Sequence, residues 1–242
     1  MEPANDVNKL SSTNVAIVLA GGAGHRFGAE RPKQFLQVGG MSILERSVWA
    51  FEAHPAIDEI AVVVHPDFLT EVSEMVSANG WRKVKHLLPG GRERYESSLA
   101  ALRAYEKGPE CNVLFHDAAR PLVSSRMITD VVNALQNHQA VDVAVPVTDT
   151  ILQTDDSGDF ICAVPDRNTL RASQTPQAFR LSVIQEAYRR ALASGPLATT
   201  DDCGVVLRFM PEIPIFIVPG EEANFKVTYP SDVTRLKQYL DE

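Results

Sequence analysis

The chain has 242 residues with a net charge of −8, and 45% of its residues are hydrophobic and 22% charged. This is the profile of a soluble globular protein with one large α/β domain or two smaller ones. The acidic balance argues against a general nucleic-acid binder, no apolar run approaches the roughly 18 residues of a membrane span, and three scattered cysteines are typical of a reducing cytoplasm.

Residues 1–14 lack the basic segment and apolar core of a signal peptide, and we expect a short flexible tail there. Beyond the tail, strand and helix patterns alternate at residues 15–19, 43–53, 60–64, 68–79, 84–88, 94–106, 113–116, 125–137 and 141–145. This alternation predicts parallel β-α-β units in a doubly wound sheet, where ligands bind beyond the carboxyl ends of the strands. The segments 21–24, 90–91 and 117–120 each follow a strand and should therefore gather at one edge.

The alternation is interrupted between residues 147 and 173. Two short strands are predicted at 150–153 and 160–164, with the turn sequence Asp-Asp-Ser-Gly between them. We expect this hairpin to project as a β-arm and to pair with a second chain, because exposed strand edges are commonly covered in that way.

The remaining pattern predicts elements at residues 181–193 (helix), 215–218 (strand), 224–228 (alternating strand) and 231–240 (helix, with Ser231 as its N-cap). We therefore expect residues 15–242 to form a single domain from which the β-arm projects.

The loop after the first strand says most about function. Gly21, Gly22 and Gly24 allow a ligand to approach the backbone closely, because glycine has no Cβ. Arg26 and Lys33 place two cations beside this loop, a combination that suits a polyphosphate.

Three known loops compete for this stretch. The dinucleotide fingerprint fails, because Phe27 stands where its third glycine belongs. The P-loop fails because no Gly-Lys-Ser or Gly-Lys-Thr occurs in the chain. The nucleoside-triphosphate loop of sugar-nucleotide pyrophosphorylases, L-A-G-G-x-G-x-R-[FM]-G…P-K, is intact from Leu19 to Lys33.

Further candidates follow later strands. Asp117 is placed to organise a metal-nucleotide or a polyol hydroxyl, and Arg120 to hold a phosphate, although a plain Asp–Arg surface pair is the alternative. Gly91 would let the backbone reach a base edge, and Ser97 offers a hydroxyl to nucleotide oxygens.

After the hairpin, Arg167 is a candidate for an acceptor phosphate. Thr175 precedes a proline and is therefore biased to an extended conformation that would present its hydroxyl. Lys226 is either a further ligand or an ordinary surface lysine. The histidines show no ligand spacing, so we expect no metal site built by the protein alone.

The chain carries, in order, the segments V-L-A-G-G-x-G-x-R-F-G…P-K-Q-F, H-D-A-A-R-P, P-V-x-D-T, Q-T-P-Q-x-F and N-F-K-V-T-x-P. Together they resemble the cytidylyltransferases of polyol phosphates, which act on 2-C-methyl-D-erythritol 4-phosphate or on ribitol 5-phosphate. The resemblance implies a Rossmann-like nucleotidyltransferase fold with a mostly parallel sheet flanked by helices, and a homodimer joined through the β-arm. It also implies Mg²⁺ brought in by the nucleotide, with Asp117 as the nearest candidate for the ion. The reaction it implies converts CTP and a polyol phosphate to CDP-polyol and pyrophosphate.

By the same resemblance, Arg26 and Lys33 stabilise charge on the triphosphate, and Arg167 and Lys226 complete the catalytic set. The residues it places around CTP are Ala20, Gly21, Gly22, Gly24, Gly91, Ser97 and Asp117. The residues it places around the acceptor are Asp117, Arg120, Thr150, Arg167, Thr175 and Lys226.

Two departures leave the acceptor open. Methylerythritol enzymes usually carry a tryptophan soon after the Asp-Arg dipeptide, whereas this chain has Leu170 and Arg171, and Cys203 replaces a usual alanine. These residues favour a pentitol phosphate slightly, while the Asp-Arg-Asn-Thr-Leu sequence at 166–170 keeps the methylerythritol pattern. A pyrophosphorylase for another nucleotide and a catalytically inactive relative are the remaining alternatives.

Overall fold

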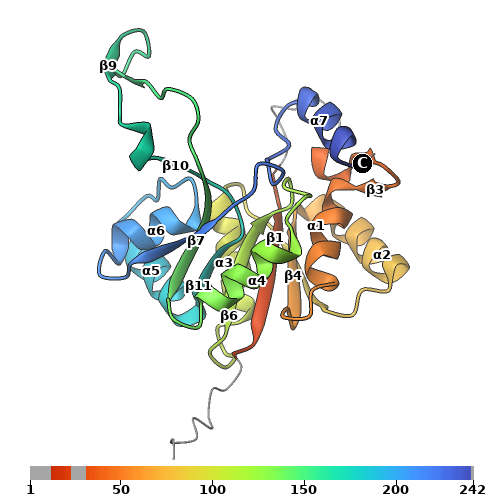
Figure 1. Ribbon diagram of the computed structural model, residues 1–242. Helices are drawn as coiled ribbons and strands as arrows, with labels where there is room; N and C mark the ends of the chain where they lie inside the picture. The colour runs from red at the N-terminus through yellow and green to blue at the C-terminus, as the bar shows by residue number, and fades with distance from the viewer. Residues whose placement is uncertain (1–11, 23–30, 241–242) are drawn as a thin grey trace, which may run out of the picture.

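A mixed eight-stranded sheet forms the centre of the computed structural model, which describes residues 12–22 and 31–240 (Figure 1). The path of paired strands runs β10 (Arg171–Ser173), β7 (Ala140–Pro146), β11 (Gln177–Arg180), β6 (Asn112–Asp117), β1 (Asn14–Ala20), β4 (Glu59–Val64) and β5 (Val84–Pro89), and β12 (Ile215–Pro219) pairs with β7. Neighbours among β6, β1, β4 and β5 pair in parallel, as do β12 and β7, whereas β10 and β11 run antiparallel to their partners.

The first strand is buried along its whole length. Its side chains alternate between the two faces of the sheet, so Ala16 and Val18 join one hydrophobic cluster while Val15 and Ile17 join the other. A strand covered on both faces has no polar side to present, which explains the uninterrupted apolar run from Val15 to Ala20.

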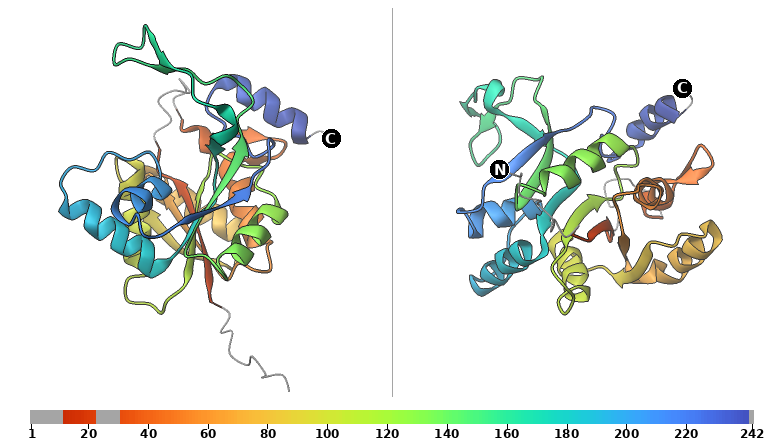
Figure 2. Two further views of the ribbon diagram at one scale, coloured as in Figure 1. Left: turned by 60° about the vertical axis from the view of Figure 1, so that its left-hand side comes forward. Right: turned by 60° about the horizontal axis from the view of Figure 1, so that its bottom comes forward.

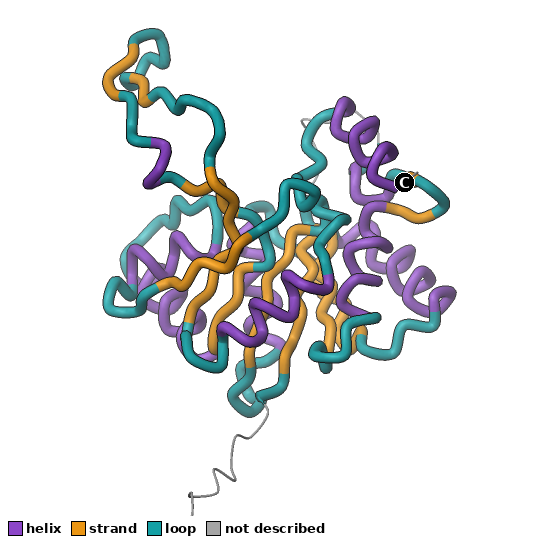
Figure 3. Tube along the Cα trace, in the orientation of Figure 1, coloured by secondary structure: helices purple, strands orange, loops and turns teal. Residues whose placement is uncertain are grey.

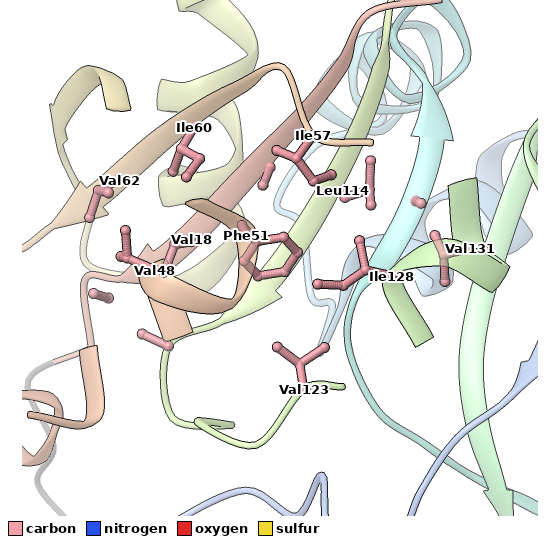
Figure 4. Close-up of a cluster of buried hydrophobic side chains, with 14 of the residues drawn as sticks. Val18, Val48, Phe51, Ile57, Ile60, Val62, Leu114, Val123, Ile128 and Val131 are labelled. Carbon is pink, nitrogen blue, oxygen red and sulfur yellow. The ribbon is translucent and has the colours of Figure 1, made fainter. Parts of the chain in front are cut away.

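Helices cover both faces of this sheet (Figures 2 and 3). One face packs against α1 (Ile43–Glu52), α2 (Leu69–Asn79) and α4 (Ser125–Ala134). Figure 4 shows part of this cluster, where Phe51 of α1 and Ile128 of α4 lie beside side chains of the sheet. The other face packs against α3 (Arg94–Ala104), α5 (Leu181–Ala193) and α6 (Asp202–Phe209).

A smaller cluster lies beside the main core. It joins α7 (Pro230–Leu240) to the hairpin of β2 (Gln37–Val38) and β3 (Met41–Ser42), through Val38, Ile43, Val227 and Leu236. Because Val227 is fully buried there, this cluster anchors the loop that carries the neighbouring Lys226.

The segment between β7 and β10 projects away from the sheet (Figure 1). It contains an antiparallel pair, β8 (Gln153–Thr154) and β9 (Ile161–Ala163), followed by η4 (Arg167–Thr169). The predicted turn is confirmed, because Asp155 Oδ1 accepts from the Gly158 N–H at 3.0 Å and Gly158 has φ of +81°. Large apolar side chains are exposed on this segment, namely Ile151, Leu152, Phe160, Ile161 and Val164.

The predicted α/β alternation and Rossmann-like fold class are confirmed. The arm strand predicted at 150–153 begins only at Gln153, and β10 was not predicted. Four other segments also differ. The tail was expected to reach residue 14, but β1 already begins at Asn14, whose N–H donates to Asp58 Oδ2; residues 1–11 lie outside the part described. The predicted alternating strand at 224–228 is a loop. The Val227 N–H of this loop donates to the Ala119 carbonyl, and the Asn224 side chain donates from Nδ2 to the Thr175 carbonyl.

The third difference concerns the last helix, which begins at Pro230 and not after Ser231. Asp232, the third residue of this helix, has its Oδ2 accept from the backbone N–H groups of Thr228 and Tyr229, which precede the helix. The fourth is β11, which the sequence pattern did not predict and which lies antiparallel between β6 and β7.

Candidate active site

The carboxyl ends of the central parallel strands meet at one edge of the sheet, as the sequence predicts. Leu19 of β1 pairs with Asp117 of β6, and Val64 of β4 lies between Ala20 of β1 and Pro89 of β5. A cleft of about 540 Å³ opens at this edge. The predicted site residues that line it are Ala20, Gly21, Gly22, Lys33, Gly91, Ser97, Asp117 and Lys226.

The base of the glycine loop is fixed by a buried glutamine. Gln34 Nε2 donates to the carbonyl oxygens of Ala20 at 2.7 Å and of Gly22 at 3.1 Å. Gln34 belongs to the short helix η2 (Lys33–Phe35), so the same turn that holds the loop also carries Lys33 to the cleft. Gly24 and Arg26, which the sequence assigns to this loop, lie outside the residues that the structure describes.

A second glycine turn packs directly against the first, since a Cβ on Gly90 would lie 3.2 Å from Gly21 Cα. A Cβ on Gly21 would lie 2.8 Å from Ser97 Oγ, so the two segments approach as closely as they do only because Gly21 has no side chain. Ser97 is buried, and its hydroxyl accepts from the Gly91 N–H at 3.2 Å. In this arrangement Ser97 shapes the turn that begins α3.

Four charged side chains form a row beside these turns. Lys226 Nζ lies 2.7 Å from Asp117 Oδ2, Arg94 Nε lies 3.2 Å from Asp117 Oδ1, and Arg94 Nη1 lies 2.6 Å from Asp202 Oδ2. Burial alone would raise the pKa of Asp117, but Arg94, Lys226 and Arg120 together hold this pKa well below its usual range. Asp117 is therefore ionised throughout the physiological range.

The backbone beneath Asp117 is held by a buried polar chain. The Asp117 N–H donates to Thr175 Oγ1 at 3.1 Å, and this hydroxyl lies 3.0 Å from His116 Nδ1. Burial lowers the pKa of His116 to about 4, so this imidazole is neutral at pH 7. Thr175 was expected to present its hydroxyl to a ligand, but the side chain is buried and its oxygen is occupied by these neighbours.

Arg120 links two loops rather than lining the cleft. Its Nη1 donates to the Asn224 carbonyl at 2.7 Å and its Nη2 to the Ser173 carbonyl at 3.3 Å. These bonds hold the loop that carries Lys226 against the strand that ends the arm.

Thr150 and Arg167 lie in the projecting segment, and neither lines the cleft of the same chain. Arg167 is exposed and donates from Nη1 to the Thr148 carbonyl at 2.9 Å. Within one chain, the structure therefore does not bring these two side chains together with the row of charges.

A family model described as IspD, 2-C-methyl-D-erythritol 4-phosphate cytidylyltransferase, matches residues 14–242. The chain belongs to this family. It is accordingly a nucleotidyltransferase that transfers a cytidylyl group from CTP to a polyol phosphate, which confirms the prediction made from the five sequence segments.

Individual relatives agree with this assignment. The chain is 52% identical over 222 residues to the 2-C-methyl-D-erythritol 4-phosphate cytidylyltransferase of Thermobifida fusca, covering 90% of this chain and 89% of that one. It is 38% identical to the bifunctional ribulose 5-phosphate reductase/CDP-ribitol pyrophosphorylase of Haemophilus influenzae, covering 91% of this chain but 46% of that one.

Solved structures share the fold. The 4-diphosphocytidyl-2C-methyl-D-erythritol synthase of Anaerococcus prevotii superposes with a TM-score of 0.84 at 28% identity, covering 96% of this chain and 97% of that one. The 2-C-methyl-D-erythritol 4-phosphate cytidylyltransferase of Thermus thermophilus gives a TM-score of 0.73 at 29% identity, with 95% and 100% covered.

The cytidylyltransferase cleft offers little to a metal ion by itself. No group of three or more His, Cys, Asp or Glu side chains could hold a metal within residues 12–22 and 31–240. Asp117 is the one predicted carboxylate at the cleft, and each of its oxygens already meets a cation. This donor set fits an ion that arrives on a triphosphate with most of its ligands supplied by phosphate and water.

No helix in the described part of the chain is long and apolar enough to cross a membrane.

Sequence reasoning missed two members of the cytidylyltransferase site, Arg94 and Asp202. Asp202 does begin a helix, and its carboxylate has no exposed surface and also accepts from the Tyr188 hydroxyl at 2.7 Å. Arg94 likewise begins a helix, where charged residues are common. The spacing in the sequence could have indicated Arg94, because this residue lies three positions after Gly91, on the first turn of α3.

Proposed function

We propose that this cytidylyltransferase uses 2-C-methyl-D-erythritol 4-phosphate as its acceptor and works with Mg²⁺ as a homodimer. The observation that carries the proposal is the convergence of Lys33, Lys226 and Asp117 with two glycine turns on one cleft. Such a cleft suits two anions that must meet, because its cations offset their mutual repulsion.

In the proposed reaction, an oxygen of the acceptor phosphate attacks the α-phosphorus of CTP in line with the leaving group. The new P–O bond forms as the bond from the α-phosphorus to the bridging oxygen breaks, and pyrophosphate departs with the electron pair. No covalent enzyme intermediate is needed, so the protein acts by placing the reactants and stabilising charge.

We assign the nucleotide to the side of the cleft formed by the two glycine turns. Backbone groups of Ala20, Gly21, Gly22 and Gly91 would contact CTP, with Ser97 holding the second turn in shape. Gly24 and Arg26 are assigned to the same loop from sequence, and Arg26 and Lys33 would stabilise charge on the triphosphate. Asp117 is the residue that would hold Mg²⁺, and the ion, when bound, would neutralise part of the charge of the triphosphate.

We assign the acceptor to the side of Lys226 and Asp117. Lys226 would bind its phosphate, and Arg120 and Thr175 would act indirectly, because their polar atoms already hold the surrounding loops. Thr150 and Arg167 would complete the pocket from the arm of the partner subunit. The exposed apolar side chains of the arm support this pairing, since they would be covered by a second copy.

Methylerythritol phosphate is preferred to ribitol phosphate because of the comparisons. Identity is 52% to a relative named for the first substrate and 38% to one named for CDP-ribitol formation. Ribitol 5-phosphate is the second candidate, favoured by the residues at 170, 171 and 203. We place the reaction in the cytoplasm, in keeping with three cysteines that form no disulfide.

A pyrophosphate-release assay tests the proposal. Each of four nucleoside triphosphates is combined with Mg²⁺ and with methylerythritol 4-phosphate, ribitol 5-phosphate or ribulose 5-phosphate. We expect release only with CTP, and kcat/KM at least about tenfold higher for methylerythritol phosphate, a ratio equivalent to about 1.4 kcal/mol. A preference for ribitol phosphate would replace the first acceptor by the second. Release with another nucleotide, or none at all, would contradict the cytidylyltransferase itself.

A further inference from the structure

The guanidinium of Arg94 connects Asp117 at the cleft to Asp202 of α6. Arg94 is the first residue of α3, and it donates to carboxylates from two other elements. Asp117 ends β6, and Asp202 begins α6. The planar fork of an arginine can reach two such acceptors at once, which the single ammonium of a lysine cannot do with the same geometry.

The charges alternate along this row. Lys226 and Arg94 flank Asp117, and Arg94 is in turn flanked by Asp117 and Asp202. The Asp202 side chain is fully buried and that of Asp117 is only 13% exposed, so neither carboxylate can rely on water for charge compensation. Without Arg94, the buried Asp202 would lose its cationic partner, while Asp117 would keep Lys226.

The geometry also fixes the direction in which Asp117 faces. Arg94 takes Oδ1, which leaves Oδ2 for Lys226. The Lys226 side chain is 41% exposed, so the Asp117 contact and the buried neighbour Val227 are what restrict it. An ammonium has three donor hydrogens, and the bond to Asp117 orients the other two.

We propose that Arg94 is a positioning residue for the acceptor side of the site: it fixes Asp117, and Asp117 fixes the Lys226 ammonium at the cleft. This inference rests on the proposed function, because it takes Lys226 to bind the acceptor phosphate. Arg94 itself acts through Asp117 and Lys226. Its loss should therefore raise the acceptor KM much more than the KM for CTP.

A double-mutant cycle tests this proposal with CTP, Mg²⁺ and methylerythritol 4-phosphate. The variants are Arg94→Lys, Lys226→Ala and their combination. We expect each single substitution to raise the acceptor KM by about tenfold or more, with the KM for CTP changed by less than about threefold. Because both substitutions act on one contact, the acceptor KM of the double variant should lie within about threefold of that of Lys226→Ala alone.

Tyr188→Phe is the matched control. It removes the hydroxyl from the other oxygen of Asp202 but leaves both ion pairs of Arg94 in place. A lower melting temperature with an unchanged acceptor KM is expected for this variant. If Tyr188→Phe raises the acceptor KM as much as Arg94→Lys does, the row is only a structural support and the proposal fails.

An unchanged acceptor KM in Lys226→Ala would remove Lys226 from the acceptor site and overturn the proposed function on which the inference rests. A raised KM in Lys226→Ala with fully additive effects in the double variant would overturn only the role of Arg94. Should Arg94→Lys be unfolded at the assay temperature, Arg94→Gln takes its place in the cycle, since glutamine keeps a donor for Asp117 without the charge.

Discussion

Lys33 reaches the cleft from a turn that Gln34 ties to the glycine loop. We predict that Lys33→Ala lowers kcat by about 100-fold or more, because a charge used mainly in the transition state has an effect of that size. Steady-state pyrophosphate release measures it. Lys85→Ala, which removes an exposed lysine of β5 that does not line the cleft, is the control. Turnover near that of the unaltered enzyme, in a folded variant, would exclude Lys33 from the mechanism.

Asp142 gives a prediction about pH and stability. Burial, together with the nearby Asp201, raises the pKa of Asp142 to about 6 from an ordinary 3.8. Between these values the folded protein binds more protons at this carboxyl than the unfolded chain does. The stabilising contribution of Asp142 is therefore complete below about pH 4 and is lost as the pH rises through about 6.

Asp142→Asn should remove this dependence, because an amide oxygen can still accept from Ser173 and Gln177. As the pH rises from 4 to 8, the free energy of unfolding of the variant should increase by about 1–3 kcal/mol relative to that of the unaltered protein. Urea denaturation at several pH values measures the difference. Asp156→Asn, in an exposed turn, controls for net charge, and an equal trend in both variants would contradict the assignment to Asp142.

The sequence predicted cleft residues where a motif carries them locally. Lys33 follows a glycine loop, and Asp117 ends an apolar strand, so both could be found from short patterns. Arg94 and Asp202 could not, since they are separated by 108 residues and each alone looks like a charge at a helix start. The surroundings of Thr175 could not be predicted either, because its hydroxyl lies against His116, which is 59 residues away in the sequence.

At the scale of elements, the arm exposes large apolar side chains that no other part of its own chain covers. Phe160 is 71% and Ile161 is 61% exposed. We predict that the protein is a dimer at micromolar concentration and that Phe160→Asp weakens the dimer by at least about tenfold, because a charge would be buried in the interface. Light scattering over a dilution series measures this. Leu207→Asp, on a comparably exposed leucine of α6, should leave the dimer intact, and a monomeric unaltered protein would refute the pairing.

Arg167 gives a second prediction for the arm. Arg167→Ala should raise the KM of both candidate acceptors by a similar factor of about ten, since their common group is a phosphate. Binding of CTP, measured by calorimetry, should change little. Arg189→Ala is the matched control, because this exposed guanidinium pairs with Glu186 on α5 and does not line the cleft. Loss of CTP binding in Arg167→Ala would assign this residue to the nucleotide instead.

Elements of strong periodicity could be predicted from sequence, and short ones could not. The apolar runs of β1, β4 and β6 and the spacing of α1 and α4 leave little choice of structure. β10 and β11 have three and four residues, too few for a pattern, and their strand form depends on pairing with β7 and β6. The loop at 224–228 alternates in sequence but is shaped by buried polar contacts.

At the scale of the whole molecule, an acidic protein presents a cleft where lysine and arginine side chains gather. The net charge of −8 is carried elsewhere, while Lys33, Arg94 and Lys226 line the site. Local charge, and not the overall balance, therefore decides which substrate is attracted. The fold supports this division, because parallel strands bring residues far apart in the sequence to one edge of the sheet.

The most direct test of the central claim is a ³¹P NMR spectrum of the enzyme with CTP, Mg²⁺ and 2-C-methyl-D-erythritol 4-phosphate. We predict that the three CTP signals and the acceptor monophosphate signal decay together. A pair of coupled signals from a diphosphate diester and the single signal of inorganic pyrophosphate should appear in equal molar amounts. A spectrum in which CTP persists, or in which CMP and pyrophosphate form while the acceptor signal is unchanged, would contradict the account.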